Sequence, residues 1–425
     1  MKLKHLIVIL LSAGLFSHCS KDENSTSEPD IEGRTQIEEQ KLELYFSYFG
    51  LGSSESDNWI IIHDENGKLV DFKKADYGKV LEFTALKDSI PNKISITEFH
   101  YFEGYEGNLS HRLFTYTDIE PGSSLYKPYN YSIPNNIGTF DLRIENIPGV
   151  YSHNISIEGG PINPKEVNIE GNLTSNTLVL SEIRLYENEE YVFSIYDKSG
   201  NHKYLLLESP VNESDLVFDY SEFKEFDDYF EIPMPPYSSM WLYSYGYAED
   251  DPNYNFFGQT LSHYQSTDYP DTVRVGYLDK YKKFKTEFNV SLDGFTYNFI
   301  KTGNKVENIQ VPSKPNYVLR DSSVYDLTFT TDLKLSSKNS THTYDNGENI
   351  HTQWSVYSSA NSFHKVGKLP EEVVSKYPNL NLDKLNILTV TLFTQGYTQQ
   401  EIFDQLTSKE KKGDKTIESY LYIYL

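Results

Sequence analysis

The sequence predicts an all-β protein made of tandem antiparallel β-sandwich units, immunoglobulin-like or related, and three observations favour this class. Tyrosine and phenylalanine are abundant, with 35 and 24 residues against 3 methionines, and aromatic side chains suit half-buried strands. Two apolar runs, Trp59–Lys68 and Val192–Asn201, both end in an Asp-x-x-Gly turn. Glycine accepts the positive φ that a tight hairpin requires, so both runs predict a hairpin.

Matched positions further along the chain indicate that the second hairpin belongs to a repeat of the first unit. The strand pattern Phe140–Ile144 corresponds to Phe288–Leu292, in the same order relative to the hairpins. Tandem domains keep the order of their motifs while their loops change in length. We therefore expect one β-sandwich unit over residues 39–165 and a second over residues 166–315.

The remainder, residues 316–425, predicts a shorter β-rich unit with a short helix. The sequence Thr398-Gln399-Gln400-Glu401 is a capping box, and the helix that follows would bury Ile402, Phe403 and Leu406. Apolar and polar residues alternate in the last eight residues, which predicts a terminal strand paired within a sheet. Two further strands are expected at Tyr325–Phe329 and Leu385–Phe393.

The N-terminus predicts export. Lys2 and Lys4 precede an apolar stretch, and this is the layout of a signal peptide over residues 1–18, too short to span a bilayer as a permanent helix. Cys19 is the only cysteine in 425 residues, so it cannot form an internal disulfide. Residues 19–38 are polar and without periodicity, which is typical of a flexible tether.

The residues around Cys19 carry a family resemblance. Phe16-Ser17-His18-Cys19 resembles the cleavage site of bacterial lipoproteins, and Ser20, Lys21, Asp22 and Glu23 resemble the export signal of surface-exposed lipoproteins of the Bacteroidota. The resemblance implies acylation of Cys19 and anchorage in the outer membrane, facing the cell exterior. Each buried methylene of the acyl chains would contribute about 0.8 kcal/mol to that anchorage. The alternative is an ordinary secretory signal followed by an unused cysteine.

The charge balance limits the partners. Without residues 1–18 the chain carries 36 basic and 62 acidic residues, which argues against nucleic acid as a partner. An acidic surface also repels anionic lipid and polyanionic polysaccharide, so neutral or cationic ligands are favoured. The expected partners are the outer membrane, through the lipid anchor, and a glycan or protein ligand.

The candidate ligand-binding residues are Trp241, Tyr243, Tyr245 and Tyr247, which alternate with smaller residues. Alternation places all four aromatic side chains on one face of a strand. A row of flat rings can stack on the apolar faces of sugar rings. The competing interpretation is that the aromatic side chains face the core, because large apolar side chains are usually buried and the opposite face looks too small to fill a core.

Other sites have little support in the sequence. The chain contains no nucleophile elbow, P-loop or dinucleotide fingerprint, so no catalytic residue and no cofactor is expected. Its histidines are scattered, and acidic turns such as Asp64–Gly67 supply too few ligands for calcium, so we expect no metal.

The sequence therefore favours a non-catalytic surface lipoprotein that binds a glycan or peptide, with a role as accessory to an outer-membrane importer as one form of this function. Adhesion to host or neighbouring-cell proteins through tyrosine-rich faces is the alternative. A glycan-active enzyme comes third.

Replacement of Cys19 by alanine tests the anchor. We expect the Cys19→Ala protein to leave the membrane fraction and to lose labelling by a palmitate analogue, because the acyl chains have no other attachment point. Continued labelling of the variant would contradict the lipoprotein assignment.

Overall fold

The structure is a computed structural model, and part of the chain is described. The described residues are 42–50, 57–76, 78–104, 107–127, 135–157, 160–161, 176–187, 189–208, 210–236, 239–247, 258–266, 271–360, 365–396, 398–407 and 417–425. The predictions for Cys19, for Ser20, Lys21, Asp22 and Glu23, and for the boundary at residue 165 lie outside these residues. Residues Leu42–Leu425 form one compact unit.

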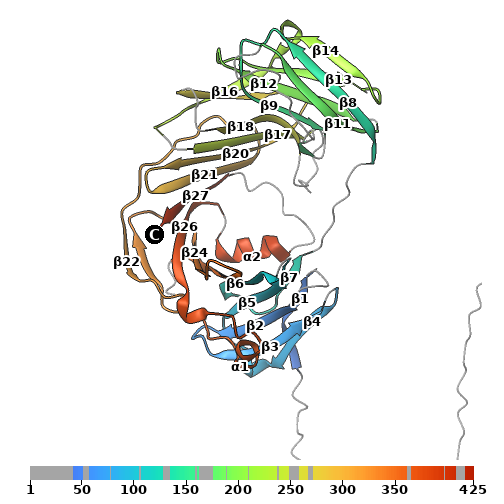
Figure 1. Cartoon of the computed structure of the whole chain (residues 1–425). Helices are drawn as coiled ribbons and strands as arrows, with labels where there is room; N and C mark the ends of the chain where they lie inside the picture. Colours follow the sequence, from blue (N-terminus) through green and yellow to red (C-terminus); the bar gives the residue numbers. More distant parts are fainter. Residues whose placement is uncertain are drawn as a thin grey trace, which may run out of the picture. The chain divides into compact units, whose positions relative to one another are not determined.

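A 12-stranded sheet is the largest element of this unit (Figure 1). Its neighbours are antiparallel except for β25 and β6, which are parallel. In spatial order the strands are β18 (Gln259–Ser266), β17 (Ser239–Tyr247), β20 (Lys283–Leu292), β21 (Phe295–Gly303), β27 (Ile417–Tyr424), β26 (Asn386–Gln395), β24 (Ser337–Asp345), β25 (Ile350–Ser359), β6 (Leu109–Ile119), β5 (Ile94–Glu103), β2 (Asp57–Asp64) and β3 (Leu69–Ala75).

Smaller sheets accompany it. A three-stranded sheet has the order β4 (Val80–Leu86), β1 (Leu42–Gly50), β7 (Ser123–Lys127), and another has the order β11 (Leu178–Tyr186), β8 (Asn136–Glu145), β14 (Asp215–Asp219). A five-stranded sheet has the order β10 (Gly160–Pro161), β9 (Val150–Ile157), β12 (Glu190–Asp197), β13 (His202–Glu208), β15 (Lys224–Glu225). Two-stranded pairs are β16 (Asp228–Pro233) with β19 (Thr272–Tyr277), and β22 (Tyr317–Asp321) with β23 (Thr328–Thr331).

Helices are few among the described residues. The α-helices are α1 (Glu371–Lys376) and α2 (Gln399–Thr407), and the 3-10 turns are η1 (Lys87–Ser89), η3 (Tyr220–Glu222) and η4 (Leu382–Lys384). The all-β prediction is confirmed at the level of class, and the immunoglobulin-like assignment stays a prediction. No helix in the described part of the chain is long and apolar enough to cross a membrane.

Sheet pairing does not follow the expected unit boundaries. The 12-stranded sheet takes β2, β3, β5 and β6 from residues 39–165, β17, β18, β20 and β21 from residues 166–315, and β24–β27 from residues 316–425. Likewise β8 and β9, which precede residue 165, pair with β11 and β12, which follow it. The reason is hydrogen bonding between strands distant in the chain, which a local pattern does not encode.

The two predicted hairpins are confirmed, and their turns are alike. In the β2–β3 turn, Oδ1 of Asp64 accepts hydrogen bonds from the backbone N–H groups of Asn66 and Lys68, both at 2.9 Å. In the β12–β13 turn, Oδ1 of Asp197 accepts from the backbone of the second and fourth residues after it at 2.9 and 2.8 Å. Gly67 and Gly200 have φ values of 79° and 86°, which glycine adopts without strain.

Predictions for the C-terminal residues are confirmed with one correction. Thr398 and Glu401 form the capping box of α2, and Phe403 of this helix is fully buried, whereas the side chains of Ile402 and Leu406 lie outside the described residues. The terminal strand β27 pairs with β21 and β26. The strand expected at Tyr325–Phe329 is wrong in its first half. Val324 and Tyr325 pack instead on the cluster around Trp354.

The two faces of the 12-stranded sheet differ. One face contributes to a large apolar cluster that includes Leu242, Phe288 and Leu421 and to a second cluster around Trp59 and Trp354. Buried polar residues of β24 and β25, such as Ser340 and Ser358, lie on the same face between them. The opposite face is covered over β2, β5 and β6 by the β4-β1-β7 sheet and by α2, which share a third cluster. From β27 to β17 this opposite face carries polar and aromatic side chains, and we call it the polar face.

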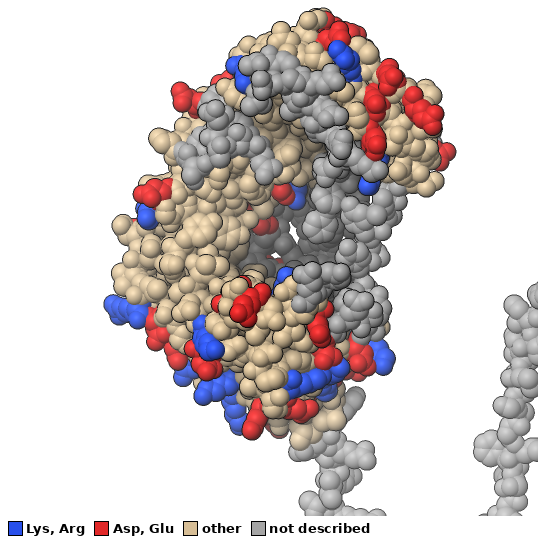
Figure 2. Space-filling model, viewed as in Figure 1, with Lys and Arg blue, Asp and Glu red and all other residues tan. Residues whose placement is uncertain are grey.

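Acidic and basic side chains are intermixed on the surface. Figure 2 shows lysine and arginine next to aspartate and glutamate in several places, and a broad area with few charged residues over β20 and β21 in the same view. The face seen in Figure 2 therefore carries charged residues of both signs.

A charged cluster fastens α1 to the edge of the sheet. The Asp57 carboxylate accepts from Nζ of Lys74 and Nζ of Lys376, both at 2.7 Å, and from the hydroxyl of Tyr377 at 2.9 Å. That hydroxyl in turn accepts from Nε1 of Trp59 at 3.0 Å. Burial alone would raise the pKa of Asp57, but the hydrogen bonds from these donors hold it well below its usual value.

Removal of this carboxylate charge should loosen α1. We expect Asp57→Asn to lower the free energy of unfolding at pH 7 by about 1–3 kcal/mol, the usual contribution of hydrogen bonds to a charged group. Because the folded pKa is depressed, this stabilisation is complete above about pH 4 and is lost as the pH falls further. Urea denaturation at several pH values measures the difference, and Asp76→Asn, at an exposed pair with Lys79, is the control that should change nothing.

Candidate functional site

The four aromatic side chains predicted as a ligand platform lie on β17, on the polar face of the 12-stranded sheet. Met240 and Leu242 of the same strand point into the largest hydrophobic cluster, with exposed fractions of 2% and 0%. Trp241 and Tyr243 are half-buried and belong to none of the buried clusters of the described residues. Tyr245 and Tyr247 of the same strand are buried, with exposed fractions of 6% and 9%. Which of the two interpretations holds for the four side chains therefore stays a prediction.

The core side of β17 has small residues because an aromatic ring from another segment of the chain occupies the space beside them. A Cβ atom added to Gly246 would lie 2.4 Å from the ring of Tyr281, so that ring occupies the space a larger residue would take. Tyr281 is itself buried in the cluster that contains Leu242. A strand can thus have a small core-facing side when its partners supply the volume, because the interior is filled to a constant density whichever strand contributes the atoms.

The rings on the polar face form a row along β17, which we call the aromatic ladder and define as Trp241, Tyr243 and Tyr245. Tyr243 and Tyr245 are nearly parallel, with ring centroids 5.9 Å apart and planes at 5°. Trp241 is tilted by 59° from Tyr243 at 5.5 Å. Tyr247 follows on the same strand but is 9% exposed and lies against Gly258, so the ladder is most accessible at its Trp241 end.

Neighbouring strands supply polar groups beside the ladder. His263 of β18 lies opposite Tyr243 and stacks on it with centroids 4.5 Å apart. On the other side, Glu287 and Lys285 of β20 lie opposite Tyr243 and Tyr245, and Nζ of Lys285 is 2.5 Å from the Glu287 carboxylate. Lys285 also lies over the ring of Tyr245, at 6.0 Å from its centroid. These contacts fix the rings from both sides.

Electrostatics keep the site neutral in its aromatic part. Burial raises the pKa of Tyr243 and of Tyr245, and the Glu287 charge raises both further, so the phenols stay protonated. Burial lowers the pKa of His263, so its ring is uncharged at neutral pH. Its Nε2 has no hydrogen-bond partner among the described residues. The ladder is therefore uncharged, and its accessible part consists of the half-buried rings of Trp241 and Tyr243.

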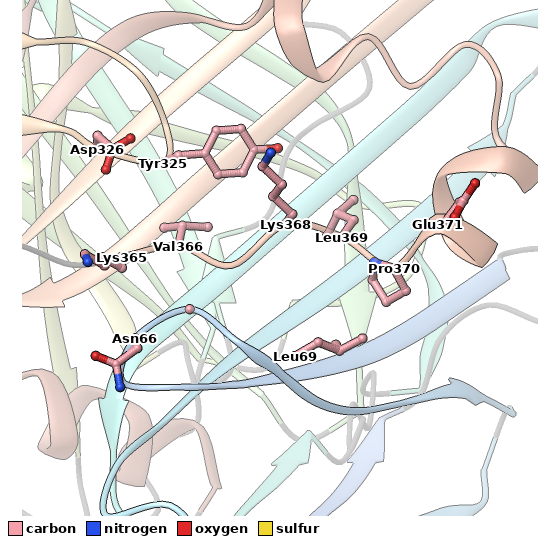
Figure 3. A pocket seen from close by; sticks show the side chains of 11 residues that line it. Asn66, Leu69, Tyr325, Asp326, Lys365, Val366, Lys368, Leu369, Pro370 and Glu371 are labelled. Carbon is pink, nitrogen blue, oxygen red and sulfur yellow. The ribbon is translucent and has the colours of Figure 1, made fainter.

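A pocket of about 610 Å³ forms a second hollow, at the β2–β3 turn (Figure 3). Its floor is apolar, and exposed lysine and carboxylate side chains stand at its rim. Its lining residues are Asn66, Gly67, Leu69, Tyr325, Asp326, Lys365, Val366, Lys368, Leu369, Pro370 and Glu371. The volume is within the range of small-molecule sites.

Packing explains this pocket better than a ligand does. The 365–371 segment covers the sheet at this point, and Nε2 of His63 is 2.9 Å from the carbonyl oxygen of Lys368. A Cβ atom on Gly367 would lie 2.0 Å from the His63 ring, so the segment approaches the strand as closely as the backbone allows. The segment that lines this pocket is thus held against the sheet by its own packing, and we treat the ladder as the candidate site.

Metal binding has no geometric support in the described part of the chain, where no three histidine, cysteine or carboxylate side chains gather as a metal site. The Asp64 and Asp197 carboxylates are engaged by backbone N–H groups of their own turns. The predictions that the protein has no metal and no cofactor stay predictions.

Sequence reasoning found the ladder but missed its neighbours. Lys285, Glu287 and Asn289 alternate with Phe284, Thr286, Phe288 and Val290 in β20, and this alternation marks them as one polar face. What the sequence does not contain is the pairing of β20 with β17, which brings this face beside the ladder. His263 had no local signal at all.

Comparisons with known proteins add little. No protein-family model and no curated protein matches the chain. A Ca²⁺-stabilised adhesin that helps an Antarctic bacterium reach out and bind ice aligns with 88% of this chain and 92% of its own at 9% identity and a TM-score of 0.13. A tetra-tandem repeat from the extending region of a large adhesion protein aligns with 90% and 99% at 10% identity and a TM-score of 0.11. Scores this low carry no argument about fold or function.

The orientation of β17 predicts that substitutions at two adjacent residues lower the free energy of unfolding by different amounts. We expect Leu242→Ala to lower the free energy of unfolding by about 2–5 kcal/mol, because it opens a cavity in the largest cluster. Trp241→Ala should cost about 1 kcal/mol or less, since it removes mainly a ring contact on a half-exposed face. Urea denaturation of both variants tests the pair, and a larger loss for Trp241→Ala would place the ladder in a core.

Proposed function

We propose that this protein is a non-catalytic binding protein of the cell surface, and that the aromatic ladder of β17 binds a neutral glycan. The observation that carries the proposal is the position of Trp241 and Tyr243 on the polar face, away from the core beneath them. Binding sites for small ligands combine apolar or aromatic surfaces with a few polar groups that fix orientation. The ladder supplies the surfaces, and Lys285 and Glu287 on β20 supply the polar groups.

Charge supports a neutral ligand. The protein has a net charge of −24, which disfavours polyanionic polysaccharides at long range. Beside the ladder, the charges of Lys285 and Glu287 compensate each other at 2.5 Å. A ligand that binds there gains from ring stacking and hydrogen bonds to hydroxyl groups, and has no net charge to match.

Surface location is part of the proposal and rests on the residues around Cys19. Acylation at this position, with the signal Ser20-Lys21-Asp22-Glu23 after it, would present residues 42–425 at the outer membrane. A role beside an outer-membrane importer agrees with such a location. That the protein is not an enzyme is likewise part of the proposal.

A glycan array with the soluble chain from Lys21 onward tests the proposal. We expect saturable binding to neutral glycans and a loss of affinity of at least tenfold in Trp241→Ala and in Tyr243→Ala, which corresponds to about 1.4 kcal/mol each. The matched control is Tyr229→Ala on β16, where the tyrosine is 54% exposed and belongs to a separate two-stranded sheet.

Two outcomes would count against it. Glycan binding that is unchanged in both ladder variants would place the site elsewhere. An array without any bound glycan, together with binding to cell-surface proteins, would favour adhesion instead.

A further inference from the structure

A second group of aromatic side chains lies on the same polar face, on β26 and β27. Phe393 and Tyr420 have ring centroids 5.2 Å apart, and Tyr420 and Tyr422 form an edge contact at 5.4 Å. All three are half-buried, as Trp241 and Tyr243 are. The terminal strand thus presents rings on the side opposite Leu421 and Ile423, which belong to the core.

Strand register places the two aromatic groups in line. Directly opposite residues form the row Trp241, Asn289, Asn298, Tyr420, Phe393 across β17, β20, β21, β27 and β26. The next row is His263, Tyr243, Glu287, Ile300, Glu418. Residues opposite each other in a sheet share a face. Three steps between neighbouring strands separate Trp241 from Tyr420, a distance of about 14 Å.

The surface between the two groups is polar, and we call it the polar floor. Nδ2 of Asn289 donates to Oδ1 of Asn298 at 2.6 Å. Glu287 is held by Lys285, and the exposed fractions of these side chains are 20% and 21%. Glu418 lies two strands beyond Glu287, with Ile300 between them. Asn298 is only 3% exposed, so the floor offers a ligand mainly the half-buried Asn289 and Glu287 side chains between the two aromatic groups.

We propose that Tyr420 forms a second aromatic subsite and that the ligand is a neutral oligosaccharide laid across the strands, from the ladder to β27. This inference rests on the proposed function and specifies the length of its ligand. One sugar ring stacks on Trp241 and another on Tyr420. The hydroxyl groups of the sugar units between these two rings form hydrogen bonds with the polar floor.

Chain length follows from the separation of the subsites. A single sugar ring contacts one aromatic group, whereas a ligand that spans about 14 Å contacts both. The second contact is then made within one complex, at a high effective concentration, so affinity rises with ligand length until both subsites are filled. An extended peptide is a poorer fit, because peptides that bind sheets pair with the backbone at an edge strand, and the polar face offers side chains only.

The test is isothermal titration of the full soluble chain with two neutral series, β-1,4-linked glucose and α-1,6-linked mannose, each of one, two, four and six residues. For at least one series we expect the six-residue probe to bind at least tenfold tighter than the two-residue probe. Tyr420→Ala should abolish this gain and leave the affinity for the two-residue probe unchanged. Trp241→Ala should weaken binding of every length.

Two further variants control for folding and for general loss of tyrosine. Tyr420→Leu keeps an apolar contact to Phe393 without the flat ring, so it should behave as Tyr420→Ala does if stacking matters. Tyr424→Ala removes a tyrosine that is 55% exposed on the same strand, beyond both rows, and should leave affinities at every length unchanged.

The outcomes separate the two proposals. If Trp241→Ala weakens binding but affinity does not depend on length or on Tyr420, the second subsite is refuted and the ladder remains the binding site. If no probe binds, both proposals fail for neutral glycans. Cleavage of a six-residue probe that is lost in Glu418→Gln would show a catalytic site on the polar floor and overturn the assignment as a non-catalytic protein.

Discussion

The parallel pairing of β25 with β6 is the contact on which the rest of the architecture depends. It joins Ile350–Tyr357 to Leu109–Tyr116, and Nε1 of the fully buried Trp354 donates to Oγ1 of Thr115 at 2.8 Å, across 239 positions of sequence. Without this pairing, β6 and β25 would both be open edges, and the large sheet would divide into one sheet of four strands and one of eight. Long-range pairing of this kind carries a loop-closure cost, which the buried side chains on both strands offset.

The two faces of the large sheet are packed by different kinds of side chains. One face is packed by two apolar clusters. The other is packed by the β4-β1-β7 sheet and α2 at one end and by polar and aromatic side chains at the other. The aromatic ladder therefore belongs to a surface that folding already left uncovered by the main cores. Rigid strands hold its rings, which favours a site that needs little ordering when a ligand binds.

What the sequence could predict was local. The hairpins at Asp64 and Asp197, the capping box of α2 and the alternation of β27 follow from residues within a few positions of each other, and all were found. Strand partners were not predictable, because backbone hydrogen bonds carry no residue code. Trp59 and Trp354 illustrate this, since they lie in one cluster although the sequence assigned them to separate units. The alternation that places Trp241 and Tyr243 on one face of a strand was visible in the sequence, but the ring that occupies the space beside Gly246 belongs to Tyr281, 35 positions further along the chain.

The compact side of β17 also bears on how this protein can evolve. Met240 and Leu242 pack in the core and Gly246 lies against a core ring, whereas Trp241 and Tyr243 do not contribute to it. Substitutions at positions 241 and 243 of this strand should therefore rarely cost the protein its fold, because destabilising changes are concentrated at buried positions such as 240 and 242. Selection for a new surface ligand would act on positions where substitutions change stability little. The same positions are suitable for randomisation in a library designed to change the specificity.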